Sequence, residues 1–425
     1  MDRSLYENHL AVLKSELITA LGCTEPIAIA LAGARARQLL GTMPETATVY
    51  CSGNIVKNVM GVTVPNSGGL RGINVAALLG IIGGDADLDL DVLSTITDEH
   101  REKLKEMLAL GVCIPKLRED VENLYIRVEL AAGGHSSIVE IRDTHKNVTY
   151  MEKDGVAIPV HAEKEEKQAA PAGDKSLITV DNAIEFAEQV ELDDVRPILE
   201  RQISCNMAIC EEGLKNPYGA EVGRTLMKCS DQNDVGHLAR AYAAAGSDAR
   251  MNGCALPVVI NSGSGNQGIT VSVPVIVYAR HYGLGEEKLL RALTAANLIA
   301  LHQKYYIGSL SAYCGVVSAA CGAACGISML MGYPREVINS TITNTIATVG
   351  GMVCDGAKSS CAAKISTALQ TALLGLEMGI NGSTFRPGEG MVTDDVEETI
   401  SNIGRMGREG MKATDKEILN IMLGN

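Results

Sequence analysis

The segment that most constrains the fold is residues 315–332, GVVSAACGAACGISMLMG, which carries no charged side chain. It is about long enough to cross a bilayer as a helix. However, Gly, Ala, Ser and Cys dominate it, no second comparable segment accompanies it, and no cluster of Lys or Arg flanks it. We therefore expect a helix buried inside a soluble protein and no membrane association.

The rest of the chain suits close packing of helices. Of its 425 residues 46% are hydrophobic, yet there is no Trp and there are only two Phe. Ala, Val, Ile, Leu and Met must therefore fill the core. Small side chains let helix backbones approach closely, which favours a compact helical body over a pocket walled by aromatic rings.

The net charge and the cysteine content exclude some classes of protein. The formal net charge is −14, whereas nucleic-acid binding requires clustered Lys and Arg to neutralise phosphates. The start, MDRSLYENHLAVLKSEL, predicts an amphipathic helix and lacks the apolar core of a signal peptide. Twelve cysteines without such a signal do not indicate a disulfide framework. We expect a cytoplasmic protein that binds neither nucleic acid nor membrane; a homodimer would be unsurprising.

The sequence predicts an α+β fold in which a large, mostly helical domain carries a smaller inserted α/β domain. Residues 1–45 predict helices that pack with the C-terminal body. Residues 46–165 predict the smaller domain, because polar and apolar residues alternate from Leu124 to Ile141 as in strands. Residues 177–425 predict the helical catalytic domain.

Two further segments carry organisational signals. Residues 161–176, HAEKEEKQAAPAGDKS, are charged and aperiodic, which is typical of a surface linker. Residues 257–277 are rich in Val and Ile, and we expect them to form the one strand-like stretch of the C-terminal part.

The segment GGMVCDGAKSSCAAKIS, residues 350–366, holds two thiols among small residues. In a continuous helix, Cys354 and Cys361 would be about 10 Å apart, which is wide for one metal ion. The pair Asp355-Gly356 favours a turn, after which a helix would begin near Ser359 or Ser360 with serine as its N-cap. The thiols would then converge where a helix start favours negative charge. Packing residues are the alternative.

Three more cysteines follow each other in YCGVVSAACGAACGI, where steps of seven and eleven residues predict one helical stripe for Cys314, Cys321 and Cys325. A packing seam of small residues explains this pattern, so at most one need be a ligand. No C-x₂-C pair of a zinc ribbon or ferredoxin is present.

Polar residues with binding capacity occur in NSGSGNQGITVSVPV, residues 261–275. Its Gly and Ser residues, followed by Asn266 and Gln267, offer backbone N–H groups and amides to a small anion such as a carboxylate. It is neither a Walker A loop nor a dinucleotide fingerprint. A flexible turn is the alternative.

Another thiol stands at the expected start of a helix in LGCTEPIAIALA, where Thr24 would be the N-cap. There Cys23 should have a lowered pKa and could act as a base, a nucleophile or a ligand. Inert packing is the alternative. His135 and His145 lie at turns of the strand region, where exposed, solvated histidines are the usual case.

Taken together, LGCTEPIAIALA, NSGSGNQGIT, YCGVVSAACGAACGI and GGMVCDGAKSSCAAKIS resemble one family. They are similar, in order and over nearly the whole chain, to the single-chain relatives of bacterial iron–sulfur L-serine dehydratase, a group that includes L-cysteine desulfidase. VPNSGGLRGI and GGHSSIVEI also fit this pattern.

The resemblance implies an oxygen-sensitive [4Fe–4S] cluster held by Cys314, Cys354 and Cys361, with one iron open. It implies α,β-elimination without pyridoxal phosphate, from L-cysteine to pyruvate, ammonia and sulfide or from L-serine to pyruvate and ammonia. Cys23 resembles the family position proposed as base or extra ligand, and we expect it to act as the base. The resemblance also implies that Ser264, Asn266 and Gln267 bind the substrate, with Asn66, Lys358 and His135 as weaker candidates.

Two other function classes stay open. A pyridoxal-phosphate lyase would need a Schiff-base lysine, for which Lys358 or Lys364 could be offered without support from a motif. A non-enzymatic iron–sulfur redox sensor would need a partner surface, and the acidic composition disfavours DNA as that partner.

Overall fold

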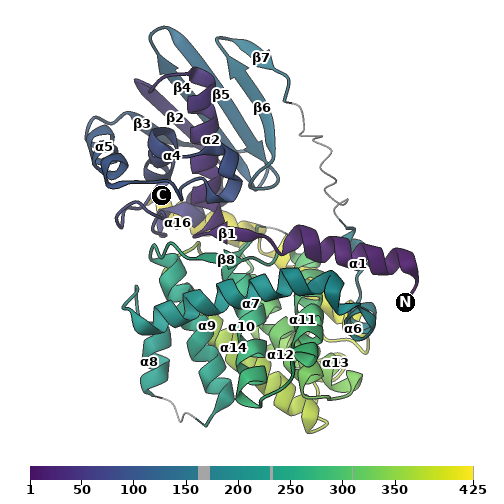
Figure 1. Ribbon diagram of the computed structural model, residues 1–425. Helices are drawn as coiled ribbons and strands as arrows, with labels where there is room; N and C mark the ends of the chain where they lie inside the picture. The colour runs from purple at the N-terminus through teal and green to yellow at the C-terminus, as the bar shows by residue number, and fades with distance from the viewer. Residues whose placement is uncertain (161–172, 230–232, 309, 425) are drawn as a thin grey trace.

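The computed structural model describes residues 1–160, 173–229, 233–308 and 310–424. A unit built on a sheet lies against a larger body of helices (Figure 1), which confirms the expected α+β class. Most of the linker expected at 161–176 lies outside the described residues.

The main sheet of the described residues has the strand order β3-β2-β4-β5-β6-β7. Its pairs are antiparallel except for β2 with β3, which run parallel. The strands are β2 (Thr46–Cys51), β3 (Cys113–Leu117), β4 (Tyr125–Ala132), β5 (His135–Arg142), β6 (Val148–Lys153) and β7 (Val156–Ile158). As the alternation predicts, Ile126, Val128 and Leu130 of β4 share one buried face.

Four helices accompany this sheet: α2 (Thr24–Leu40), α3 (Gly53–Met60), α4 (Ile73–Gly83) and α5 (Asp98–Ala109). Helix α2 packs against β4, β5 and α4. We expected both N-terminal helices to pack with the C-terminal body. Helix α1 (Arg3–Glu16) packs there against α6, α7 and α11, whereas α2 packs mainly against the sheet unit and meets the body at its start, where Thr24 donates to Gly263 O. The reason is that α2 is apolar nearly all round and covers the buried face of the sheet.

The body consists of helices α6 (Val180–Gln189), α7 (Leu192–Lys215), α8 (Val222–Lys228), α9 (Val235–Met251), α10 (Gly265–His281), α11 (Glu286–Ile307), α12 (Val316–Leu330), α13 (Arg335–Val349), α14 (Cys361–Ile380) and α15 (Val396–Arg405). The uncharged helix α12 is buried among α10, α11, α13 and α14, as expected. A Cβ atom at Gly326 would lie 2.8 Å from the Ala296 side chain, so its missing side chain permits close helix packing. Among the residues described, no helix has both the length and the apolar character required to cross a bilayer.

The strand expected over residues 257–277 is mostly wrong. Only β8 (Pro257–Val259) is extended, and it pairs with β1 (Thr19–Leu21). The remainder forms α10, whose first 13 residues are all buried. A helix buried on all sides has no polar stripe, so its sequence pattern resembles that of a buried strand.

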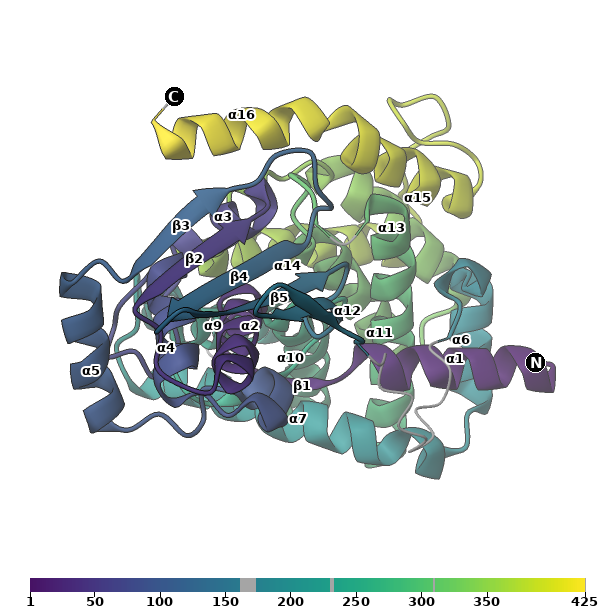
Figure 2. The same ribbon diagram turned by 90° about the horizontal axis from the view of Figure 1, so that it is seen from above.

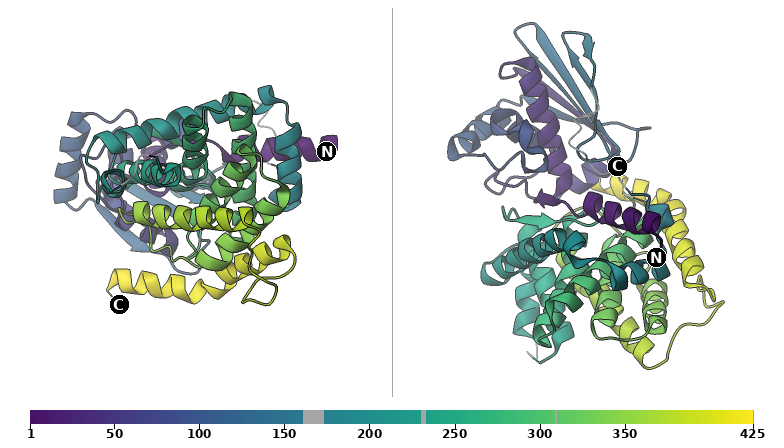
Figure 3. Two further views of the ribbon diagram at one scale, coloured as in Figure 1. Left: turned by 90° about the horizontal axis from the view of Figure 1, so that it is seen from below. Right: turned by 45° about the vertical axis from the view of Figure 1, so that its right-hand side comes forward.

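The C-terminal helix α16 (Lys412–Leu423) follows a single π-helical turn, Met406–Gly410, and returns to the sheet unit beside α3 (Figures 2 and 3). There Asp415 accepts a hydrogen bond from Lys57 Nζ of α3. The Lys57 side chain is 2% exposed, and Asp415 supplies the counter-charge that a buried ammonium requires.

Candidate active site

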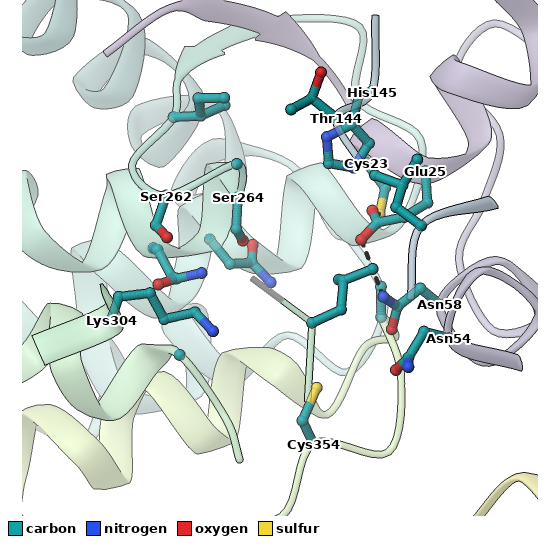
Figure 4. A pocket seen from close by; sticks show the side chains of 18 of the residues that line it. Cys23, Glu25, Asn54, Asn58, Thr144, His145, Ser262, Ser264, Lys304 and Cys354 are labelled. Atoms are coloured by element: carbon teal, nitrogen blue, oxygen red, sulfur yellow. Dashed lines mark hydrogen bonds between the residues drawn. The ribbon is translucent and has the colours of Figure 1, made fainter. Parts of the chain in front are cut away.

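A cavity of about 400 Å³ lies where the sheet unit meets the helical body. The start of α2, the turn at 143–146 and the end of α9 contribute to its wall, as do residues 262–267, 314–316 and 354–361. Figure 4 shows side chains from these distant segments pointing into one space, with Cys354 at one end and Cys23, Glu25 and His145 at another. The cavity therefore requires both parts of the fold.

Three of its lining residues are the cysteines expected as cluster ligands: Cys314, Cys354 and Cys361. Two short segments hold the first two together, because Cys354 N–H donates to Ala312 O (2.6 Å) and Cys314 N–H donates to Met352 O (2.8 Å). Cys361 is the first residue of α14. The structure thus brings the predicted distant thiol and the close pair to the same cavity.

The turn between the close pair depends on Gly356, whose φ of 94° favours glycine. A Cβ atom there would also collide with the backbone oxygen of Lys57. We expected a helix to begin near Ser359 or Ser360, and α14 begins at Cys361 with Ser360 at the N-cap position. The Ser360 hydroxyl forms no capping hydrogen bond, so the turn rather than this cap positions Cys361.

Positive charge surrounds the thiols. A hydrogen bond from Cys314 lowers the pKa of Cys354 to about 6 against the effect of burial, and the Lys57 charge acts in the same direction. The same pairing and burial raise the pKa of Cys314. Burial lowers the pKa of Lys304 to about 8, opposed by the nearby thiols Cys354 and Cys314. One of the paired thiols is thus stabilised as a thiolate.

This donor set fits an iron–sulfur cluster better than a single ion. Across the described ranges, no three Cys, His, Asp or Glu side chains lie close enough together to hold one metal ion. A cluster differs because each thiolate binds a different iron, so its ligands surround a volume. Cys314, Cys354 and Cys361 do line one volume, and all three are free thiols.

The single stripe expected for Cys314, Cys321 and Cys325 is wrong. Cys314 precedes α12 and lies in an extended segment, where its neighbour Tyr313 bridges to Val353. Cys321 and Cys325 lie inside α12, are fully buried and do not line the cavity. They are packing residues of the helical body.

A hydrogen-bonded carboxylate, Glu25, lies beside Cys23. It accepts hydrogen bonds from Cys23 Sγ (3.0 Å), Thr24 Oγ1 (3.1 Å) and Asn58 Nδ2 (3.0 Å). Burial opposes ionisation of Glu25, but the His145 charge and the Cys23 hydrogen bond outweigh it and lower the pKa of Glu25.

The lowered pKa expected for Cys23 is wrong. Burial, followed by the negative charge of Glu25, raises the pKa of Cys23 well above its usual value. Cys23 itself, and not Thr24, is the N-cap residue of α2, and its side chain donates to Glu25 rather than capping the helix. The influence of the helix start is therefore the weaker effect.

The polar segment expected to bind a small anion forms a tight turn before α10. Ser262 and Gly263 adopt φ of 50° and 72°, and the residue pair Asn261–Ser264 closes the turn. The expected binding residues Ser264, Asn266 and Gln267 all line the cavity. Missing side chains make room for them, because a Cβ atom at Gly315 would lie 2.5 Å from Gln267 Cδ.

The three weaker candidates lie elsewhere. Asn66 donates to Leu93 O (2.8 Å), and His135 pairs with Asp154 (2.9 Å) at an exposed hairpin. Lys358 forms an ion pair with Asp355 (2.5 Å). None of the three is among the residues that line this cavity. His145, which we expected to be exposed, lines it instead, and its Nε2 atom is buried.

Four cavity residues were missed: Glu25, Asn58, Arg250 and Lys304. Glu25 lies two positions after Cys23 in the first turn of α2, where an acidic residue is ordinary. Arg250 and Lys304 end long buried helices, and a charge in the last turn of a helix is ordinary. Only their burial, at 2% and 4% exposure, distinguishes them.

Comparisons with known proteins match most or all of the chain. A family model described as the serine dehydratase alpha chain matches residues 87–420. A UPF0597 protein of Lachnoclostridium phytofermentans is 50% identical over 419 residues, which are 99% of this chain and 100% of that protein. A UPF0597 protein of Treponema denticola is 43% identical over 427 residues, 100% and 99% of the two chains. One from Desulfitobacterium hafniense is 46% identical over 420 residues, 98% and 97%.

Proposed function

Because the chain belongs to the serine dehydratase alpha chain family, we propose that it is a lyase acting on a small β-substituted L-amino acid. The reaction is α,β-elimination: the substrate loses the Cα proton and its β-substituent, and the resulting aminoacrylate takes up water to give pyruvate and ammonia. L-Cysteine would release sulfide and L-serine water.

One observation supports this proposal: three free thiols and a set of polar side chains, among them the buried Asn266 and Gln267, line the same cavity. Cys314, Cys354 and Cys361 would hold a [4Fe–4S] cluster. When bound, such a cluster supplies a Lewis acid that makes the β-substituent a better leaving group. The nearby Lys57 and Lys364 charges compensate the negative charge of the thiolates.

The chain's own residues handle the proton and the orientation of the substrate. Glu25, the ionised partner, would first accept the Cys23 thiol proton across their 3.0 Å hydrogen bond, and the resulting thiolate would then take the Cα proton. Ser264, Asn266 and Gln267 would orient the amino-acid head group by hydrogen bonds.

The proposal is tested anaerobically with the full chain. The protein is reconstituted with iron and sulfide, its visible spectrum is recorded, and pyruvate, ammonia and sulfide are measured from L-cysteine and L-serine. We expect a broad charge-transfer band and pyruvate, both lost in Cys354→Ala and in air. Release of sulfide identifies L-cysteine as the substrate, and turnover of L-serine identifies L-serine.

Other outcomes would contradict the proposal in different ways. A cluster band without turnover of either amino acid would favour a redox sensor. A yellow, oxygen-resistant lyase activity would favour pyridoxal phosphate. If neither the charge-transfer band nor pyruvate appears, Cys314, Cys354 and Cys361 are core packing residues and not cluster ligands.

A further inference from the structure

The guanidinium of Arg250 is buried in the cavity wall without a carboxylate partner. Arg250 lies in the last turn of α9, and its side chain is 2% exposed. Nη1 donates to Asn266 Oδ1 (3.2 Å), whereas Nε has no hydrogen-bond partner. In the part of the chain that the structure describes, no Asp or Glu oxygen forms an ion pair with it. A buried charge left in this way is costly unless an anion completes the site.

Residues at the turn that precedes α10 fix the position of this guanidinium. Gly265 follows the turn directly, and a Cβ atom there would lie well inside contact distance of Arg250 Nε and 2.5 Å from Val258 Cγ2. Asn266, the next residue, accepts the one hydrogen bond that Arg250 makes. The segment GSGN thus seats the guanidinium against the cavity rather than neutralising it.

The carboxylate that faces the same site, Glu25, already accepts hydrogen bonds from other groups. Glu25 contributes to the electrostatic environment of the same site, but its oxygens accept from Cys23, Thr24 and Asn58. The Nε2 atom of His145 is also buried without a partner. One end of the cavity therefore offers the unpartnered Arg250 Nε donor and its positive charge next to a fixed carboxylate, a pattern complementary to an amino-acid zwitterion.

We propose that Arg250 binds the α-carboxylate of the substrate and thereby selects free amino acids over their amides. This inference rests on the proposed function, because it assumes that an amino acid occupies the cavity. A guanidinium presents parallel N–H donors that match a carboxylate, so it supplies geometry as well as charge. Binding there would orient Cα relative to Cys23.

Binding of an unreactive ligand tests this directly. L-Alanine has no β-leaving group, and L-alaninamide lacks the carboxylate charge. Their affinities for the full chain, both reconstituted and cluster-free, are measured by isothermal titration calorimetry. We expect at least tenfold tighter binding of L-alanine by the wild type and loss of this preference in Arg250→Met.

Two variants sharpen the test. Arg250→Lys keeps the charge but loses the paired donors, and we expect it to reduce the preference for L-alanine over L-alaninamide at least threefold. If Arg250→Met does not fold, this variant alone tests the role of the guanidinium. Arg240→Met is the matched control, because Arg240 lies on the same helix, does not line the cavity and donates to Ser366. It should keep the wild-type preference.

The inference is overturned if Arg250→Met still prefers L-alanine, or if the wild type binds both ligands equally or neither. Failure of the proposed function gives a different result, namely an Arg250-dependent preference without pyruvate from L-cysteine or L-serine. Pyruvate formation that is indifferent to Arg250 would instead refute only this inference.

Discussion

The thiol of Cys23 donates to the carboxylate of Glu25, with 3.0 Å between Sγ and Oε2, although the side chains are only two positions apart. The interaction is possible because Cys23 stands before the first turn of α2 and Glu25 inside it. It joins the proposed base to a buried proton acceptor.

Replacing this acceptor should impair proton transfer more than folding. In Glu25→Gln we expect the rate of pyruvate formation to fall by about 100-fold or more, because the amide cannot receive the thiol proton. Initial rates are measured on the reconstituted protein. Glu140→Gln is the control, since Glu140 is equally buried but pairs with Arg127 and Arg142 of the sheet. Similar rates in both variants would contradict a role for Glu25.

The two groups of cysteines should behave differently toward iron. Cys361→Ser is expected to lose most of the reconstituted iron and of the visible absorbance, because Cys361 lines the cavity. Cys321→Ser should retain both, because that thiol lies inside α12. Iron and sulfide are quantified per chain under anaerobic conditions, and equal losses in the two variants would refute the ligand assignment.

Space at Gly265 should be required for folding and for binding. We expect Gly265→Ala to lower the free energy of unfolding by about 1–3 kcal/mol, because its Cβ atom overlaps Arg250 and Val258. Urea unfolding measures this effect. The control is Gly285→Ala, whose Cβ atom meets nothing within 4 Å, and it should stay within about 0.5 kcal/mol of the wild type. A Gly265 variant as stable as this control would contradict the crowding argument.

A buried acid should make stability depend on pH. Burial raises the pKa of Asp248 to about 6, partly offset by the N–H groups of Gly223 and Val222. Between about pH 4 and 6 the folded state holds a proton that the unfolded state has released, so this contribution to stability is lost as the pH rises. Asp248→Asn should therefore increase the free energy of unfolding by about 1–2 kcal/mol at pH 8 and by less at pH 4. Urea titrations that show the same effect at both pH values would exclude this explanation.

The ion pair between Lys57 and Asp415 should anchor the last helix. Asp415→Asn leaves a buried ammonium without its counter-charge, and we expect a loss of about 3 kcal/mol in the free energy of unfolding. The exposed Glu417→Gln, on the same helix, should change it by no more than about 0.5 kcal/mol. Limited proteolysis at α16 provides a second measurement, and equal cleavage of both variants would contradict the anchor.

Local patterns in the sequence predicted the elements with clear signals. Helix α2 begins within one residue of its predicted start, because Pro26 marks its first turn, and Gly41 ends it with a φ of 85°. Helix α3 was missed because its eight residues are too few for a helical period to stand out. Helix α10 was predicted as a strand because burial on all sides removes the polar stripe.

The site was predictable only where side chains were unusual for their position. Paired cysteines in a Gly-rich segment drew attention, whereas Arg250 and Glu25 resembled ordinary charges of a helix end and a helix start. Their significance depends on burial and on partners such as Asn58, which tertiary structure alone establishes. His145 illustrates the same point, since a turn of the sheet unit acquires its buried neighbours only when the body closes over it.

The contact of α16 with α3 also determines when, during synthesis of the chain, the surroundings of the thiols can be completed. Lys57, whose charge acts on Cys354, meets Asp415 only 358 positions later. A ribosome must therefore have made nearly the whole protein before the surroundings of the thiols are complete. A chain that lacked its last helix would keep every residue that lines the cavity, but it would lose the counter-charge of the buried Lys57 beside it.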